Sequence, residues 1–156
     1  DLGHFAEVTK RCLNADCADM EGAGAAGGLG YAFMAYLKAD LRPGIDLVLE
    51  AVDMDEAMKG ADLVFTGEGR LDHQTAMGKA PVGIAALAKK HGAAVIAFAG
   101  SVADGAEACN DKGIDAYFPI LRQVVTLDEA MEPQAARRNM TKTAEQVMRL
   151  VRAVKK

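Results

Sequence analysis

The sequence predicts an α/β protein built on a parallel sheet, as shown by three apolar runs and the segments between them. The runs at residues 62–66, 94–99 and 115–120 have the composition of buried strands. The segments near 79–91 and 106–112 have helical composition, and a glycine follows each. Strands that alternate with helices pair in parallel through right-handed crossovers. We therefore expect a three-layer, Rossmann-like lobe with a β-α-β-α-β core.

The C-terminal third predicts a capped turn and a long amphipathic helix. Thr126 and Glu129 have the spacing of a capping box, and Pro133 is expected to restart the helix. The apolar side chains of the last helix recur at helical spacing and predict its buried stripe. They are Met140, Ala144, Val147, Met148, Val151 and Val154.

The N-terminal third is predicted to be helical and rich in glycine. Residues 2–13 carry apolar side chains at helical spacing. The segment GAGAAGGLG at residues 22–30 then leads into residues 31–40, which we expect to form a largely buried helix. We expect residues 1–58 to finish one lobe and residues 59–156 to return to a second α/β lobe.

Composition excludes several classes of protein. The net charge is −4 and the basic residues are scattered, which argues against a nucleic-acid partner. No apolar run approaches the roughly 20 residues that span a bilayer, and no signal peptide is visible. The three cysteines form no CxxC pair, which favours reduced thiols in a cytoplasmic protein. Because the sequence begins with Asp1 and three parallel strands are few for a covered sheet, we expect a longer gene product and a tendency to self-associate.

The segment TGEGRLDHQTAMGKAP at residues 66–81 is the strongest candidate for a ligand loop. It is long and polar and follows a predicted strand, and ligands of open α/β sheets bind at the carboxyl ends of the strands. The turn at Gly67-Glu68-Gly69-Arg70 and a second turn at Gly100-Ser101 should therefore meet at one edge. Arg70 is suited to a carboxylate or phosphate, and Lys79, at a helix start, to an anion.

The remaining polar residues of this segment allow two interpretations. Glu68 and Asp72 are hard oxygen ligands suited to Mg²⁺, and Thr66 and Thr75 add hydroxyl groups. In the alternative, the segment is a surface loop in which Arg70 pairs with an acid and Thr75 caps a helix. His73 is either a solvated loop residue or an acid–base group, and its position alone does not decide between them.

The glycine-rich segment at residues 22–30 is a weaker signal. Its GxGxxG pattern matches the dinucleotide fingerprint literally, but the polar residues before Gly22 do not predict the strand that the fingerprint needs. The hypothesis that this chain is a nicotinamide-dependent enzyme therefore requires a strand that ends just before Gly22. Gly27 and Gly28 either bring a helix N-terminus close to an anion or allow close helix packing.

GAGAAGGLG, followed by TGEGRLDxQTxxGKAP and then an AGS turn, resembles the C-terminal part of the type-1 glycerate kinases. That resemblance implies two α/β lobes around a cleft and transfer of the γ-phosphoryl group of ATP to glycerate, mostly at the 2-hydroxyl. Family members are longer, and their Asp-Ser-(Phe/Tyr)-Lys start and their Gly-Gly-Ser-Ala-Thr and Asp-Gly-Gly regions are absent here. The resemblance thus implies a kinase portion that is inactive alone, with its catalytic base not placed.

On this resemblance, ATP and Mg²⁺ are the expected cofactors and glycerate is the expected partner. The expected catalytic residues are Arg70, Asp72 and Lys79, and Glu68 and Asp72 are the expected magnesium ligands. The expected substrate- or phosphate-binding residues are Gly27, Gly28, Thr66, Gly67, Glu68, Gly69, Thr75 and Ser101. The competing hypothesis is a non-catalytic module that binds an organic acid or nucleotide, or that serves in assembly.

Overall fold

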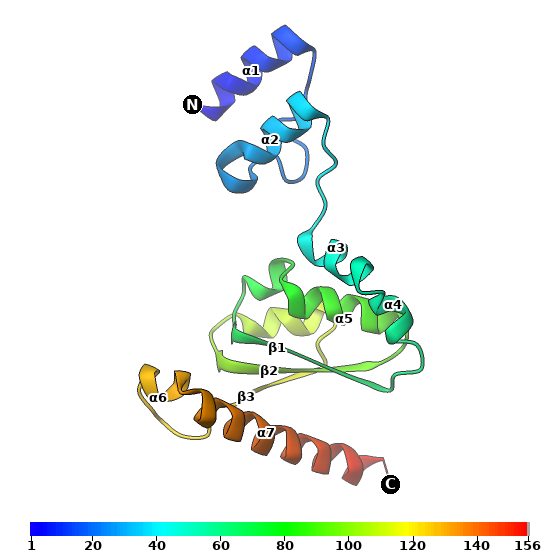
Figure 1. The fold of residues 1–156 in the computed structure, drawn as a ribbon, viewed down its shortest axis with the longest axis vertical. Helices are drawn as coiled ribbons and strands as arrows, with labels where there is room; N and C mark the ends of the chain where they lie inside the picture. The colour runs from blue at the N-terminus through cyan, green and yellow to red at the C-terminus, as the bar shows by residue number, and fades with distance from the viewer. Residues whose placement is uncertain (156) are drawn as a thin grey trace. The chain divides into compact units, whose positions relative to one another are not determined.

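The computed structural model describes residues 1–155 and divides the chain into two compact units, Asp1–Pro43 and Gly44–Lys156 (Figure 1). The second unit contains α3 (Gly44–Ala51) and α4 (Met54–Ala57), which lie before the predicted lobe boundary at residue 58. The helix α3 was not expected from the sequence, and its Ile45 side chain packs against α5 at Gly83. The two compact units are defined by contacts within this chain, whereas the predicted lobes belong to a longer protein. The lobe boundary at residue 58 therefore stays a prediction.

The second unit is built on a parallel sheet, as predicted. Its strands are β1 (Leu63–Leu71), β2 (Ala94–Val102) and β3 (Ala116–Pro119), in the order β1-β2-β3. The helices of this unit are α5 (Ala80–Lys90), the 3₁₀ helices η1 (Thr75–Met77) and η2 (Ala106–Lys112), α6 (Leu127–Met131) and α7 (Pro133–Val154). Residues 106–112 thus form a 3₁₀ helix closed by Gly113.

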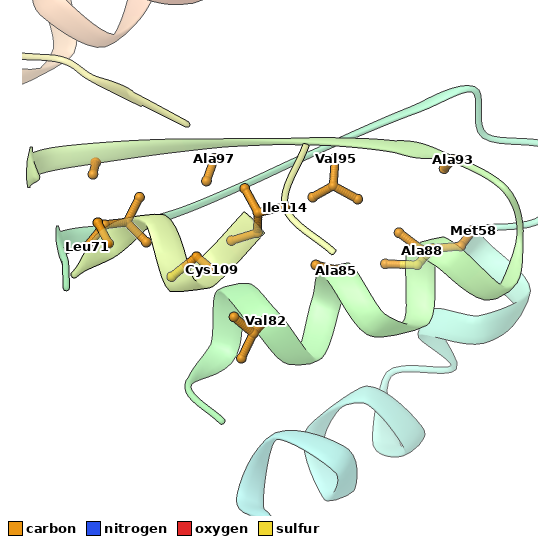
Figure 2. Close-up of a cluster of buried hydrophobic side chains, with 12 residues drawn as sticks. Met58, Leu71, Val82, Ala85, Ala88, Ala93, Val95, Ala97, Cys109 and Ile114 are labelled. Atoms are coloured by element: carbon orange, nitrogen blue, oxygen red, sulfur yellow. The ribbon is translucent and has the colours of Figure 1, made fainter. Parts of the chain in front are cut away.

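Two clusters of apolar side chains fill the space on either side of the sheet. Figure 2 shows α5 and η2 packed on one face, where the core holds mainly small residues such as Ala85, Ala88 and Val95. On the other face, Phe98 and Ile96 meet Val147 of α7. The three layers predicted from the sequence are therefore confirmed. The predicted α7 stripe is only partly buried, because Met140, Met148 and Val154 are 39%, 38% and 74% exposed.

The strands extend further than predicted. β1 continues through Leu71 and β2 through Val102, so Gly67-Glu68-Gly69-Arg70 and Gly100-Ser101 are strand residues, not turns. Glycine permits this pairing, since a Cβ on Gly67 would lie 2.6 Å from the Phe98 carbonyl oxygen. A Cβ on Gly100 would lie 2.5 Å from the Gly69 carbonyl oxygen. The predicted ligand loop is therefore the end of a strand plus the connection from residue 72 to residue 79.

The first unit pairs two helices, α1 (Leu2–Leu13) and α2 (Ala25–Leu37). Tyr31, Met34 and Ala35 of α2 are buried, and the Tyr31 hydroxyl donates to the Ala6 carbonyl at 3.2 Å. The expectation that residues 31–40 form a largely buried helix is wrong in part, because Phe33, Tyr36 and Leu37 are 41%, 50% and 70% exposed. The amphipathic pair leaves one side of α2 uncovered within this unit.

The glycine-rich segment holds a left-handed turn and not a dinucleotide loop. Residues 14–21 form no strand before Gly22, so the nicotinamide hypothesis is wrong. Ala26, Gly27 and Gly28 have φ angles of 49°, 68° and 94°, and the two glycines adopt such angles without the cost that Ala26 bears. A Cβ on Gly28 would lie 2.9 Å from Leu2, which supports the packing alternative at that position.

Asp115 joins the amino ends of β2 and β3. Its carboxylate accepts hydrogen bonds from Lys89 Nζ at 2.5 Å and from the Val95 N–H at 2.6 Å. Burial acts to raise the pKa of Asp115, but the hydrogen bonds from Lys89 and Val95 outweigh it and hold the pKa below its usual value. A carboxyl group with a lowered folded-state pKa stabilises the fold above its unfolded pKa of about 3.9, and that contribution is lost as the pH falls.

We expect Asp115→Asn to lower the melting temperature at pH 7 and to reduce the difference in melting temperature between pH 7 and pH 3. The amide keeps the shape but not the charge that both donors stabilise. Asp111→Asn is the matched control, because Asp111 is exposed and makes no hydrogen bond or ion pair within the described residues. An unchanged acid dependence in Asp115→Asn would show that this carboxylate does not tie the strands together.

Candidate functional site

The candidate site lies at the carboxyl end of β1, where the chain turns into α5. Asp72 follows the last residue of β1, η1 occupies Thr75–Met77, and Gly78 reverses the chain with a φ of 111°. Lys79 is the N-cap of α5, and Pro81 fixes its first turn. This tight connection returns Lys79 to the end of the strand that it has just left.

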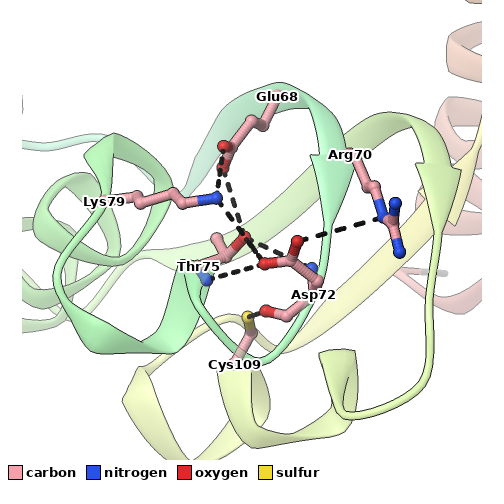
Figure 3. Close-up of polar contacts among 6 residues, drawn as sticks. All are labelled: Glu68, Arg70, Asp72, Thr75, Lys79 and Cys109. Atoms are coloured by element: carbon pink, nitrogen blue, oxygen red, sulfur yellow. Dashed lines mark hydrogen bonds and ion pairs between the residues drawn. The ribbon is translucent and has the colours of Figure 1, made fainter.

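Thr75 is the centre of the polar cluster. Its residue is fully buried, and its hydroxyl accepts from the Asp72 N–H at 3.3 Å. The same hydroxyl lies 3.3 Å from Glu68 Oε2 and 3.3 Å from Asp72 Oδ1, to either of which it can donate. The Thr75 N–H also donates to Asp72 Oδ1 at 3.1 Å. Thr75 therefore fixes both carboxylates (Figure 3).

Lys79 supplies the positive charge between these carboxylates. Its Nζ lies 3.3 Å from Glu68 Oε1 and 3.6 Å from Asp72 Oδ1 (Figure 3). Burial acts to lower the pKa of Lys79, but the hydrogen bond and charge of Glu68, then those of Asp72, raise it above its usual value. Burial likewise acts to raise the pKa of Asp72, and the Thr75 N–H and the Lys79 charge bring it below its usual value. Lys79 is thus held as an ammonium and Asp72 as a carboxylate.

Arg70 lies on the open side of the cluster. Its Nε is 3.9 Å from Asp72 Oδ2, and its side chain is 66% exposed (Figure 3). At that distance the guanidinium is only loosely held by Asp72, so most of its donors are available. Next to it, a Cβ on Gly69 would meet no atom within 4 Å, so the surface there is open. A ligand with a carboxylate or phosphate group can reach Arg70 from this side.

The other predicted site residues fall into three groups. Thr66 and Ser101 lie on the paired strands, in register with Ala97 and Arg70 and outside the hydrogen-bonded cluster. Gly67 is required by close strand packing. Gly27 and Gly28 belong to the first compact unit, so their role as backbone donors stays a prediction. The cluster itself is formed by Glu68, Arg70, Asp72, Thr75 and Lys79.

Cys109 is a neighbour that the sequence analysis did not place at the site. Its buried thiol lies 3.9 Å from the Asp72 carbonyl oxygen (Figure 3). Burial raises the pKa of Cys109, and the negative charges of Glu68 and Asp72 raise it further. The thiol is therefore a packing group and not a nucleophile. No pattern in the sequence connects it to residue 72, because only the fold of η2 brings the two together.

The chemistry of the cluster is that of anion and cation positioning. Two half-buried carboxylates, an ammonium and an exposed guanidinium converge at one sheet edge, where ligands of open α/β sheets bind. Among residues 1–155, no group of three or more His, Cys, Asp or Glu side chains is placed to hold a metal. Mg²⁺ commonly takes only one or two protein carboxylates and completes its shell with water and phosphate, so Glu68 and Asp72 fit it by donor type.

Comparisons with known proteins show which family the chain resembles. The family model for the glycerate kinase family matches residues 1–152. The glycerate kinase of Bacillus subtilis is 44% identical over 99% of this chain and 40% of its own length. The glycerate 2-kinase of Escherichia coli is 48% identical over 83% of this chain and 34% of its own length. This chain therefore spans between about a third and two fifths of the length of these relatives.

A solved structure gives the same result. A crystal structure of a provisionally named glycerate kinase 2 from Salmonella typhimurium LT2 is 38% identical and superposes with a TM-score of 0.60. It covers 93% of this chain, which in turn covers 39% of that protein. No helix in the described part of the chain is long and apolar enough to cross a membrane. Family model, sequence relatives and structure agree, and the chain belongs to the glycerate kinase family.

Proposed function

We propose that this chain is part of a cytoplasmic enzyme that transfers the γ-phosphoryl group of ATP to D-glycerate, at the 2-hydroxyl. Family membership supports a kinase that acts on glycerate, and the charged cluster supports the chemistry. Phosphoryl transfer depends mainly on positioning and on neutralising charge, and glycerate and ATP together bring several negative charges into one site. The proposal rests on one observation: two carboxylates hold the ammonium of Lys79, and one of them, Asp72, also faces the open guanidinium of Arg70.

Each residue of the cluster has a distinct role in this proposal. Arg70 binds the glycerate carboxylate or a phosphate through its exposed donors. Lys79 stabilises negative charge on the transferred group through its ammonium. Asp72 and Thr75 fix the position of Lys79. These assignments extend the predicted catalytic set of Arg70, Asp72 and Lys79 without changing it.

Magnesium is part of the proposal, with Glu68 and Asp72 as its ligands. When bound, Mg²⁺ neutralises charge on the phosphates of the nucleotide. The ammonium of Lys79 lies within 4 Å of one oxygen of each carboxylate. A Mg²⁺ ion held by Glu68 and Asp72 would therefore share these carboxylates with the Lys79 ammonium.

The isolated chain is proposed to be inactive, because it corresponds to only about two fifths of the length of the Bacillus subtilis relative. In the described sheet, β1 pairs only with β2, so its other side offers unpaired backbone groups. We propose that strands from the rest of the protein pair there. The isolated chain should then self-associate, and light scattering that shows only monomer would contradict this pairing.

We expect Arg70→Ala in the complete enzyme to reduce kcat/KM at least about tenfold, equivalent to about 1.4 kcal/mol. The loss should appear mainly in the KM for glycerate if Arg70 binds the substrate carboxylate. Arg149→Ala on α7 is the matched control, because Arg149 is an exposed arginine that pairs with Glu145 one helical turn away. An unchanged kcat/KM would remove Arg70 from the site.

The competing function is a non-catalytic module that binds an organic acid or nucleotide. Analysis of the product separates the two proposals and also fixes the position of transfer. Phosphorus NMR of the reaction mixture should show 2-phosphoglycerate formed in an ATP-dependent manner by the complete enzyme. A 3-phosphoglycerate product would keep the kinase and overturn the 2-hydroxyl, and no phosphorylated product would favour the binding module.

A further inference from the structure

A cavity lies beyond the end of β3, at the same end of the sheet as the cluster around Lys79. It has a volume of about 470 Å³ and is lined by the connection after β3, by α6 and by the first turns of α7. Figure 1 shows α6 and the start of α7 at the end where β3 finishes. The size is within the range of small-molecule sites, which begins at about 300 Å³. None of the residues in the cluster around Lys79 lines this cavity.

Three basic side chains line the cavity from two segments of the chain. Arg122 comes from the connection, and Arg138 and Lys142 come from α7. Arg138 and Lys142 are four residues apart, so they lie on one side of the helix. Within the described residues, Arg122 and Lys142 form no hydrogen bond or ion pair. Their donors are therefore available to a ligand.

The two acidic residues of the lining are already engaged. Glu129 accepts from the backbone N–H and the hydroxyl of Thr126, at 2.8 Å and 2.9 Å, in the capping box of α6. Glu132 caps α7 through the N–H groups of Gln134 and Ala135, at 3.0 Å and 2.6 Å. Neither carboxylate pairs with the basic side chains at hydrogen-bond distance. The charge of Arg138 acts on Glu132 and helps to lower its pKa, so within the described residues the cavity has two engaged acids and two unpaired cations, Arg122 and Lys142.

We propose that this cavity binds a pyrophosphate unit, meaning two linked phosphate groups as in a free polyphosphate or a nucleoside di- or triphosphate. A single carboxylate or phosphate needs only one arginine fork, whereas this cavity is lined by three cations, of which Arg122 and Lys142 are unpaired within the described residues. The lining also includes Leu121 and Val125, so one part of the cavity is apolar. Identifying the pyrophosphate as part of a nucleotide rests on the proposed kinase function. The binding of pyrophosphate itself does not depend on that function.

The test is calorimetric titration of the chain with sodium pyrophosphate at low ionic strength, where charge interactions are least screened. Arg122→Gln combined with Lys142→Gln should weaken binding at least about tenfold, equivalent to about 1.4 kcal/mol. Arg137→Gln combined with Arg152→Gln removes the same charge from exposed positions of α7 outside the cavity and should leave affinity within about twofold.

The outcomes show separately whether the cavity binds pyrophosphate and whether that pyrophosphate belongs to a nucleotide. Equal losses in both double variants, or no binding of pyrophosphate to the parent chain, would overturn the site. If ATP competes with pyrophosphate, the source is a nucleotide. If pyrophosphate binds and ATP does not compete, the cavity takes a free polyphosphate. Because no turnover is measured, the result stands apart from the test of the kinase.

Discussion

Replacing Lys79 with methionine in the complete enzyme is expected to lower kcat by about a hundredfold or more. Removing one preorganised donor to the charge that develops in a transition state typically costs this much. Methionine keeps the length of the side chain but leaves Glu68 and Asp72 without the ammonium that lies 3.3 Å and 3.6 Å from them. The loss should fall on kcat more than on KM, because the charge acts in the transition state.

Two further variants make this prediction specific. Lys59→Met is the matched control, since Lys59 is an exposed lysine that pairs with Glu56 outside the cluster. It should leave kcat within about twofold, as expected for a surface ion pair. Lys79→Arg keeps the charge in a different geometry and should recover part of the loss. A Lys79→Met enzyme with normal kcat and a normal melting temperature would exclude Lys79 from catalysis.

Replacing Thr75 with valine is expected to destabilise the protein by about 2 kcal/mol. The side chain keeps its shape, but a fully buried hydroxyl that accepts from Asp72 and can donate to Glu68 is lost. A buried polar group left without its partner costs about 1–3 kcal/mol. Urea unfolding measures this change. Thr143→Val on α7, where the hydroxyl makes no hydrogen bond within the described residues, should cost much less.

The same variant also has a consequence for pH dependence. Hydrogen bonds from Thr75 help to hold the pKa of Asp72 below its usual value. The Thr75 N–H still donates to Asp72 in the variant, but loss of the hydroxyl hydrogen bond raises that pKa, so Asp72 is protonated at a higher pH. The acidic limb of the kcat/KM profile should therefore move to higher pH in Thr75→Val. An acidic limb that stays in place would show that Asp72 does not act as a carboxylate in the reaction.

Much of the fold was predictable because its signals are local. The apolar runs, the glycines at helix ends and the capping box at Thr126 and Glu129 are all confirmed. The extension of β1 was not predictable, because Gly67 to Arg70 have no strand composition. They are held as a strand by pairing with β2, in which Gly67 is in register with Phe98 and Arg70 with Ser101. Such contacts join residues far apart in the sequence and override local propensity.

The candidate site was predictable in its members but not in its arrangement. The carboxyl edge of a parallel sheet predicted that residues 67–70 would meet Gly100 and Ser101, and these residues do pair, as strands. Nothing in the sequence indicated that Thr75 is fully buried at the centre, or that Cys109 packs beneath it. Burial of both depends on η1 and η2 lying together, which is a property of the folded chain. The sequence therefore predicts the chemistry, and the fold decides which groups are free to bind.

The most direct test of the kinase proposal is a coupled assay for ADP release from MgATP, with and without D-glycerate. It is performed on this chain and on the complete gene product that contains it. We predict ADP release that depends on D-glycerate in the complete protein, loss of that activity in Lys79→Met, and no activity in the isolated chain. Absence of glycerate-dependent ADP release from the folded complete protein would contradict the proposed function.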